Sequence, residues 1–227
     1  MTLRAVRSFV RREGRMTPAQ ADALRDAWPA YGLDYSPEII DLDAIFGRHA
    51  PRELEIGFGN GDTLLALAER HPDRDYIGIE VHRPGVGSLL RRAAALPLHN
   101  LRVSTHDAVE VLRDQIAPAS LSAVHLYFPD PWPKKRHHKR RIVQRAFVEL
   151  VSDRLEDGGR FHLATDWEPY AEWMLEMLSG CDALENAHAA GEYTPRPDAR
   201  PVTRFERRGE TLGHSVKDLS YLRRARR

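Results

Sequence analysis

Apolar residues in the middle of the chain form short continuous runs that alternate with stretches of helical spacing. The runs predict strands and the stretches between them predict helices. The predicted strands cover residues 53–57, 75–80, 101–106, 123–128 and 160–164, and the predicted helices cover residues 62–70, 84–95, 109–116, 141–155 and 169–178. Strands that alternate with helices in this way indicate an α/β fold with a doubly wound, mostly parallel sheet.

The two ends of the chain follow different patterns. Near the start, Thr17 can cap a short helix with Pro18 at its first position, and the sequence from there to residue 50 is irregular. We expect residues 1–50 to form an N-terminal arm and irregular segment, either part of the same unit or mobile, and residues 51–227 to form one domain. After Gly180, residues 186–188 and 202–207 have the character of short strands. They predict an antiparallel edge addition that brings the sheet to seven strands.

The length and composition fit one intracellular domain. A chain of 227 residues with 42% hydrophobic residues can bury a full core. Cys181 is the only cysteine, which excludes an internal disulfide and a thiolate metal cluster. There is no signal-peptide pattern, and no apolar run approaches the ~20 residues that span a bilayer. We therefore expect a cytoplasmic protein that does not enter a membrane.

The positive charges are unevenly placed. The formal net charge of +1 argues against a uniformly basic surface. Lysines and arginines nevertheless gather in three places, which are Arg4 to Arg15, Lys134 to Arg145, and Arg223 to Arg227. Local basic patches, rather than net charge, are typical of proteins that bind a phosphate backbone.

A glycine-rich turn follows the first predicted strand. Its glycines, Gly57, Gly59 and Gly61, are spaced as GxGxG, with Asp62 where a dinucleotide-binding motif has its third glycine. This departure disfavours a nicotinamide or flavin cofactor. Glu55, just before the turn, favours a cationic ligand over a phosphate, because two negative groups in a tight site repel each other.

Acids also end the next two predicted strands. Glu80 lies where ribose-binding acids are found, because a carboxylate can accept hydrogen bonds from both vicinal hydroxyls, and Asp107 ends the third strand. Taken singly, each acid could equally be a helix cap or part of a surface turn. Together with Glu55 they favour S-adenosylmethionine, whose ribose, adenine amine and α-amino group all require acceptors.

A proline-bounded acid ends the fourth predicted strand. Asp130 lies between Pro129 and Pro131, beside Trp132, and a dense cationic run follows. The prolines predict an extended backbone at Phe128 and Asp130, so that the carboxylate is presented at the sheet edge where ligands bind. The alternative is a simple turn followed by a solvated basic helix. Two adjacent histidines in the run point in different directions and predict no metal site.

These motifs and two later ones resemble the bacterial tRNA (guanine-N7-)-methyltransferases over roughly residues 51–227. The matching segments are residues 55–59, 78–82, 128–132, 164–170 and 203–206. The resemblance implies a Rossmann-like class I methyltransferase fold that uses S-adenosylmethionine, releases S-adenosylhomocysteine and modifies the variable-loop guanine at position 46 of tRNA. We expect a monomer or homodimer without a metal.

The resemblance also assigns roles to individual residues. It implies that the cofactor is bound by Glu55, Gly57, Gly59, Glu80, Asp107 and Asp130, of which Asp130 is also the catalytic acid. It implies substrate contacts from Lys134, Asp166, Thr203, Arg204, Phe205 and Glu206. The RNA-contacting segment is expected to comprise Arg136, His137, His138, Lys139, Arg140 and Arg141.

The target atom sets what the acids must do. Guanine N7 carries an in-plane lone pair and no hydrogen, so methylation needs alignment rather than a general base. The product is positively charged, and a fixed carboxylate stabilises that charge. We hypothesise that Asp130 and Asp166 accept hydrogen bonds from guanine N1–H and the exocyclic amine. Trp132 either stacks on the base or packs under the loop.

Two other functions remain open from the sequence. One is an amino-methyltransferase, because N6-adenine enzymes carry an Asp-Pro-Pro-aromatic motif at the same strand end, although Trp132 here replaces the second proline. The other is a non-catalytic RNA-binding module that retains a methyltransferase fold. The proposed cofactor acids argue against the second.

Overall fold

The computed structural model describes residues 8–9, 14–197, 200, 206 and 215–226. Within these residues, seven strands form one sheet in the order β3-β2-β1-β4-β5-β7-β6. The parallel strands are β1 (Arg52–Ile56), β2 (Asp75–Ile79), β3 (Leu101–Ser104), β4 (Leu121–Tyr127) and β5 (Leu155–Thr165). At one side of the sheet, β7 (Lys217–Arg223) pairs antiparallel with β5, and β6 (Leu184–Asn186) pairs antiparallel with β7. The expected α/β fold with an antiparallel edge is confirmed.

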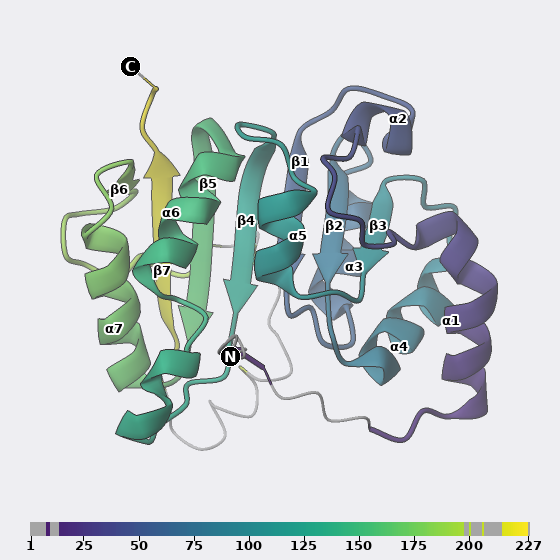
Figure 1. Ribbon diagram of the computed structural model, residues 1–227, viewed down its shortest axis with the longest axis horizontal. Helices are drawn as coiled ribbons and strands as arrows, with labels where there is room; N and C mark the ends of the chain where they lie inside the picture. Colours follow the sequence, from purple (N-terminus) through teal and green to yellow (C-terminus); the bar gives the residue numbers. More distant parts are fainter. Residues whose placement is uncertain (1–7, 10–13, 198–199, 201–205, 207–214, 227) are drawn as a thin grey trace, which may run out of the picture.

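Helices cover both faces of the sheet (Figure 1). On one face, α5 (Ala108–Asp114), α6 (Arg145–Arg154) and α7 (Glu168–Ser179) pack on the side chains of β1, β4 and β5, with Val124, Leu126 and Phe161 at the centre of this core. On the other face, α1 (Pro18–Tyr31), α3 (Asp62–Arg70) and α4 (Arg83–Ala93) pack on β2 and β3. No helix in the described ranges is long and apolar enough to cross a bilayer.

Three parts of the predicted secondary structure need correction. The segment before residue 50 contains a 14-residue α1, whose first turn is stabilised by a capping box between Thr17 and Gln20, and a short α2 (Leu42–Phe46). The helix predicted from residue 141 begins at Arg145, after a 3₁₀ helix η1 (Lys135–Arg140). The strand that completes the sheet is β7, whereas of the predicted strand at 202–207 only Glu206 is described, with a helical backbone.

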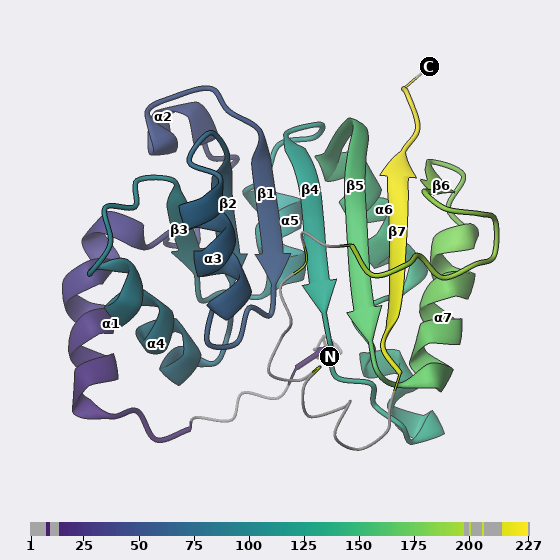
Figure 2. The ribbon, with the colours of Figure 1, turned by 180° about the vertical axis from the view of Figure 1, so that it is seen from behind.

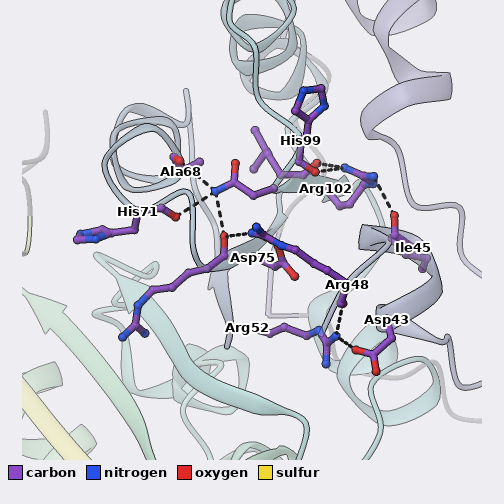
Figure 3. A network of polar contacts seen from close by, with 12 residues as sticks. Asp43, Ile45, Arg48, Arg52, Ala68, His71, Asp75, His99 and Arg102 are labelled. Atoms are coloured by element: carbon purple, nitrogen blue, oxygen red, sulfur yellow. Dashed lines mark hydrogen bonds and ion pairs between the residues drawn. The ribbon is translucent and has the colours of Figure 1, made fainter. Parts of the chain in front are cut away.

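A buried polar network ties the segment before β1 to the amino ends of β1 and β2 (Figure 3). Asp75 is fully buried, and its Oδ1 accepts hydrogen bonds from Arg48 Nε at 2.9 Å and Nη2 at 2.6 Å. Arg52 contacts Asp43 of α2, and Arg102 Nη2 donates to the carbonyl oxygen of Ile45. A buried carboxylate is tolerated only where such partners compensate its lost hydration. At this edge of the sheet, the charged side chains are therefore bound by other groups of the protein.

Candidate functional site

The opposite edge of the sheet collects the side chains that the sequence singled out. The five parallel strands all point to this edge, which is the lower one in Figure 1. The strand order reverses between β1 and β4, and ligands of open α/β sheets bind outside the carboxyl ends at such a point. The structure places acids at or just beyond the ends of β1 to β5 in turn, and these are Glu55, Glu80, Asp107, Asp130 and Asp166.

The glycine turn after β1 depends on left-handed backbone. Gly57 has a φ of +74° and Gly59 a φ of +59°, conformations that other residues adopt only with strain. A Cβ added at either position would meet nothing within 4 Å, so the conformation rather than crowding by protein atoms requires glycine. The turn thus presents bare backbone at the sheet edge, which is suitable for close approach by a ligand.

Glu55 is a buried acid that has no cation beside it among the described residues. Its side chain is 5% exposed, and its Oε2 has no hydrogen-bond partner among the described residues. Burial raises the pKa of Glu55 to about 8, with smaller contributions from the charges of Glu80 and Asp62. An acid in this state gains most from a ligand that brings a positive charge and an N–H donor. The residue fits the expected contact with the ammonium group of S-adenosylmethionine.

Glu80 holds the glycine turn in place. Its Oε2 accepts a hydrogen bond from Gly59 N, and its Oε1 accepts one from His82 N, each at 2.8 Å. Burial raises the pKa of Glu80, and these backbone donors oppose that rise. A carboxylate offers about four acceptor sites, so these bonds are compatible with additional bonds from ribose hydroxyls. Its expected role in cofactor binding stays a prediction.

Asp107 has a structural role that the sequence had left open. It is the N-cap of α5, and its side chain accepts a hydrogen bond from Val109 N at 2.9 Å. The helix-cap interpretation is therefore correct. The cap uses one carboxylate oxygen of Asp107, so the other oxygen can still accept a hydrogen bond from a ligand. The expected contact between Asp107 and the cofactor stays a prediction.

Asp130 is exposed and lies in a loop with unusual backbone angles. Phe128 has a φ of +51° and Trp132 a φ of +44°, although each precedes a proline. The expectation of an extended backbone at Phe128 is therefore wrong, because the chain turns sharply where it leaves β4. Strained angles of this kind persist only where neighbouring contacts enforce them, and they cluster at functional sites.

Arg141 supplies one of those contacts. Its side chain is buried, with the residue 3% exposed, and its Nε donates to the carbonyl oxygen of Pro131 at 3.0 Å. The guanidinium lies over the rings of Tyr170 and Trp173, 4.8 and 5.3 Å from their centroids. Arg141 thus holds the loop that carries Asp130, and its expected contact with RNA stays a prediction.

The rest of the cationic run is more accessible. Lys134, Arg136 and Lys139 are exposed, whereas His137 and His138 are partly buried. The pKa of His137 is lowered by burial and, to a lesser degree, by the surrounding lysines and arginines. The expected contacts of these residues with RNA stay predictions.

Trp132 has partners within the protein. The Arg140 guanidinium lies 5.0 Å from the centroid of its ring, and the ring nitrogen donates to the carbonyl oxygen of Ser8 at 3.2 Å. The ring of His137 meets it edge-on at 5.8 Å. These contacts favour the packed alternative for Trp132 over a free stacking platform. They also bring the beginning of the chain next to the Asp130 loop.

The remaining predicted substrate residues are unequally placed. Asp166 follows β5 directly and is half-buried, next to the exposed Trp167. Glu206 is 2% exposed and accepts two hydrogen bonds from Arg200, at 2.7 and 2.9 Å. The other three residues of its motif, Thr203, Arg204 and Phe205, lie outside the described residues.

The basic cluster at the end of the chain lies away from the site. Arg223 to Arg226 follow the end of β7, which runs toward the opposite edge of the sheet (Figure 1). Arg224 pairs with Glu185 at 3.0 Å and Arg226 with Asp157 at 2.6 Å. These ion pairs indicate that the cluster stabilises the C-terminal strand rather than extending the predicted RNA-binding surface.

The sequence did not predict a row of polar side chains on β1, β4, β5 and β7. His125 Nε2 contacts Glu53 at 2.9 Å and His162 Nε2 contacts Asp218 at 2.8 Å, while Tyr127 Oη lies 2.9 and 3.0 Å from the Nδ1 atoms of the two histidines. We call these five residues the polar row. The signal was the alternation of polar and apolar residues in 123–127 and 160–164, which we interpreted as continuous buried strands. No group of three potential metal ligands occurs among the described residues.

Glu55 generates a pH-dependent prediction. Its pKa of about 8 lies above the ordinary 4.5, so between these values the folded protein keeps a proton that the unfolded chain releases, and stability falls as pH rises. We expect Glu55→Gln to stabilise the ligand-free protein more at pH 8 than at pH 5, by a difference on the order of 1 kcal/mol per pH unit. Urea unfolding at both pH values measures this. The control Glu69→Gln, an exposed residue of α3, should change stability equally at both, and equal changes for Glu55→Gln would contradict the assignment.

Comparison with known proteins places the chain among methyltransferases. A family model described as "Putative methyltransferase" matches residues 49–219. The chain is similar to solved structures of the 16S rRNA methyltransferase KamB (TM-score 0.58, 15% identity, 83% of this chain and 95% of that one) and of an rRNA methylase from Streptococcus thermophilus (TM-score 0.53, 14% identity, 78% and 88%). At these identities the likeness concerns the fold.

Relatives of much higher identity match almost the whole chain. Proteins named tRNA (guanine-N(7)-)-methyltransferase from Shewanella halifaxensis and Aeromonas hydrophila are 56% and 55% identical over 221 residues, which is 97% of this chain and 93% of each relative. The protein of that name from Escherichia coli K12 is 55% identical over 97% of this chain and 92% of its own length. The chain therefore belongs to the tRNA (guanine-N(7)-)-methyltransferase family.

Proposed function

We propose that this protein transfers the methyl group of S-adenosylmethionine to N7 of the variable-loop guanine at position 46 of tRNA. The observation that carries the proposal is the exposed Asp130, held on a strained loop at the same sheet edge as the glycine turn and the unpaired Glu55. The family membership supports both the cofactor and the tRNA substrate. A protein that acts on tRNA is expected to work in the cytoplasm.

Each cofactor-binding residue contacts a different part of S-adenosylmethionine. Glu55 binds the α-ammonium group, the Gly57–Gly59 turn approaches the ligand with its backbone, and Glu80 accepts hydrogen bonds from the ribose hydroxyls. Asp107, at the next strand end, accepts a hydrogen bond from the adenine amine. The bound cofactor supplies a methyl group on a positively charged sulfur. The residues of the protein fix the direction in which that methyl group faces.

The acids beyond β4 and β5 act on the guanine. N7 attacks with its lone pair and loses no proton, so Asp130 has no proton to remove and its task is to orient the base. Asp130 and Asp166 accept hydrogen bonds from N1–H and the exocyclic amine and stabilise the positive charge that develops on the purine. Adenine presents an acceptor at N1 and lacks the 2-amino group of guanine, so the same carboxylates exclude it.

The exposed cations after Asp130 bind the tRNA backbone. Lys134, Arg136 and Lys139 lie on and just before η1, directly after the acid. Phosphate contacts fix the register of an RNA on a protein without reading its sequence. Their position next to Asp130 means that a bound backbone delivers a nearby base to the acid.

One assay tests the proposed function. Unmodified tRNA is incubated with the protein and labelled S-adenosylmethionine, and its nucleosides are analysed by mass spectrometry. We expect 7-methylguanosine, which should disappear when the variable-loop guanine is replaced by adenine. Formation of N6-methyladenosine would identify an amino-methyltransferase, and binding of tRNA without methyl transfer or cofactor binding would identify an RNA-binding module.

The role of Asp130 is tested by Asp130→Asn. The amide removes the negative charge and offers an N–H donor toward guanine N1–H, so we expect turnover at saturating tRNA and cofactor to fall about 100-fold, the loss typical of a positioned stabilising group. Single-turnover methylation measures it. The control Asp182→Asn alters an exposed acid after α7 and should leave the rate unchanged. Wild-type turnover of Asp130→Asn would exclude the proposed role.

The proposed RNA contacts predict a change in salt dependence. Each of Lys134→Ala, Arg136→Ala and Lys139→Ala should lower the slope of log affinity against log salt by up to ~1, because one phosphate contact releases about one counterion. Filter binding of tRNA at several salt concentrations measures the slope, and calorimetry should show unchanged cofactor affinity. Arg224→Ala removes an equally exposed charge at the other edge and should not alter the slope. If the three variants behave like Arg224→Ala, η1 is not part of the RNA-binding surface.

A further inference from the structure

Trp167 is an exposed aromatic residue at the carboxyl edge of the sheet. It follows β5 and Asp166, and it is the N-cap residue of α7. It is 38% exposed, and among the described residues Ile39 is the only other large hydrophobic residue that is exposed. Ile39 lies just before α2, at the upper, amino edge in Figure 1. A single exposed apolar side chain needs no explanation by itself, so the surroundings of Trp167 decide its meaning.

The indole N–H of Trp167 differs from those of the other three tryptophans. Each of these donates to an acceptor of the protein, and the pairs are Trp28 with Asp34 Oδ1 at 3.0 Å, Trp132 with the Ser8 carbonyl oxygen at 3.2 Å and Trp173 with the Val143 carbonyl oxygen at 2.6 Å. Within the part of the chain that the structure describes, the Trp167 ring has no hydrogen bond, ring contact or cation. Both its face and its N–H are therefore available to a ligand.

The backbone at Trp167 is firmly held. Its N–H donates to Thr165 Oγ1 at 3.3 Å, and its carbonyl oxygen accepts hydrogen bonds from Tyr170 N at 2.9 Å and Ala171 N at 3.0 Å. Pro169 lies in the same first turn of α7, and Tyr170 is fully buried. Since an indole side chain has only two χ angles, a ligand that packs on it orders little additional structure.

The strand ends that lead to Asp130 and Trp167 are neighbours. Figure 2 shows β4 and β5 side by side, with both strands running to the lower edge. Their pairing continues to the point where the chain leaves β4, because Phe128 N donates to the Ala164 carbonyl oxygen at 2.8 Å. The loop that carries Asp130 and the start of α7 therefore leave the sheet next to each other.

A second connection runs through the first turn of α7. The Arg141 guanidinium lies over the ring of Tyr170, and its Nε binds the carbonyl oxygen of Pro131, the residue after Asp130. Burial raises the pKa of Tyr170, and the nearby negative charge of Asp130 adds to this rise. Trp167 is therefore only three residues away from a ring that lies close to Asp130.

An exposed indole beside carboxylates fits a purine base. The carboxylates can bind only the edge of guanine, because its N–H groups lie in the plane of the ring, so the face of the base needs another partner. Unstacked bases of RNA are commonly bound by aromatic side chains. N7 methylation leaves positive charge on the purine, and the negative face of an aromatic ring attracts a cation. An aromatic partner therefore binds the base more strongly as its charge develops.

We propose that Trp167 is the stacking partner of the target guanine, whose face packs on the indole while the neighbouring carboxylates bind its edge. This inference rests on the proposed function, because it assumes that a guanine of tRNA enters this site. It assigns to Trp167 the stacking role for which Trp132 is poorly suited, since the ring of Trp132 is already in contact with Arg140 and the beginning of the chain.

A binding cycle that combines a protein variant with an altered tRNA tests the contact. Trp167→Ala removes the ring, and a tRNA with an abasic nucleotide in place of the variable-loop guanine removes the base. With S-adenosylhomocysteine present, we expect Trp167→Ala to weaken binding of unmodified tRNA about 10-fold, the scale of one lost base stack. Both proteins should bind the abasic tRNA equally, because the partner of the ring is missing. An equal loss for both tRNAs, or no loss for either, would overturn the proposal.

Two further variants test the attraction to the developing charge. Trp167→Phe keeps an aromatic face, whereas Trp167→Leu keeps apolar bulk without one. In single-turnover methylation at saturating tRNA, we expect Trp167→Phe to be faster than Trp167→Leu by about 5- to 10-fold, the scale of a cation–π contact. Equal rates for the two variants would contradict stacking on the reacting base.

The matched control is the other exposed hydrophobic side chain. Ile39→Ala removes apolar surface at the opposite edge and should change neither tRNA affinity nor the rate of methylation. Substitutions at exposed positions rarely disturb folding, so the affinity of every variant for S-adenosylhomocysteine, measured by calorimetry, should stay within about twofold of wild type.

The binding cycle and the methylation assay keep the two proposals apart. If wild type forms no 7-methylguanosine, the proposed function is wrong, and the cycle, which requires no methyl transfer, still decides whether Trp167 contacts this base. If wild type methylates the variable-loop guanine but Trp167→Ala loses the same affinity for both tRNAs, the proposed function stands and the stacking proposal is rejected.

Discussion

The parallel pairing of β1 with both β2 and β4 is the constraint on which the site depends. Because parallel strands need crossover connections, every chain exit from β1 to β5 occurs at one edge, and the order reverses between β1 and β4. The last cross-strand hydrogen bonds at this edge include those from Gly57 N to Ile79 O and from Phe128 N to Ala164 O, and the loops beyond them are no longer held in the extended conformation of a strand. They can therefore adopt the left-handed turn at Gly57 and the strained loop around Asp130, which would be excluded inside a strand.

Two buried acids at opposite edges show how differently the fold treats negative charge. Asp75, at the amino edge, is fully buried and receives two hydrogen bonds from Arg48. Glu55, near the carboxyl edge, is almost as buried, but it has no cation beside it among the described residues, and burial raises its pKa to about 8. One oxygen of each acid, Asp75 Oδ2 and Glu55 Oε2, lacks a hydrogen-bond partner there, so the difference between the two lies in the cation. Chains keep an uncompensated buried acid at a cost in stability. The contrast marks the carboxyl edge as the place where a ligand completes the charge balance.

The sequence predicted the elements whose signal is local. The helix at residues 62–70 was predicted with its observed bounds, because its apolar spacing and the preceding glycine define it without distant contacts. The length of α1 was missed because Pro29 lies inside it, whereas β7 was missed although alternating polar and apolar residues are a usual strand signal. The burial of Arg141 could not be predicted, since a basic run looks the same whether its last side chain is solvated or packed on aromatic rings some 30 residues later in the chain.

A reaction that needs no general base depends mainly on how the fold positions the groups around the substrate. The segment after β4 is fixed by Arg141, whose Nε binds the Pro131 carbonyl oxygen, and the segment after β6 is fixed by Arg200 through Glu206. Both arginines are buried and bind groups of the protein itself. Alignment catalysis is sensitive to displacements of about 1 Å. A buried guanidinium beneath each segment meets this requirement, because its several N–H donors resist displacement of the bound groups in more than one direction.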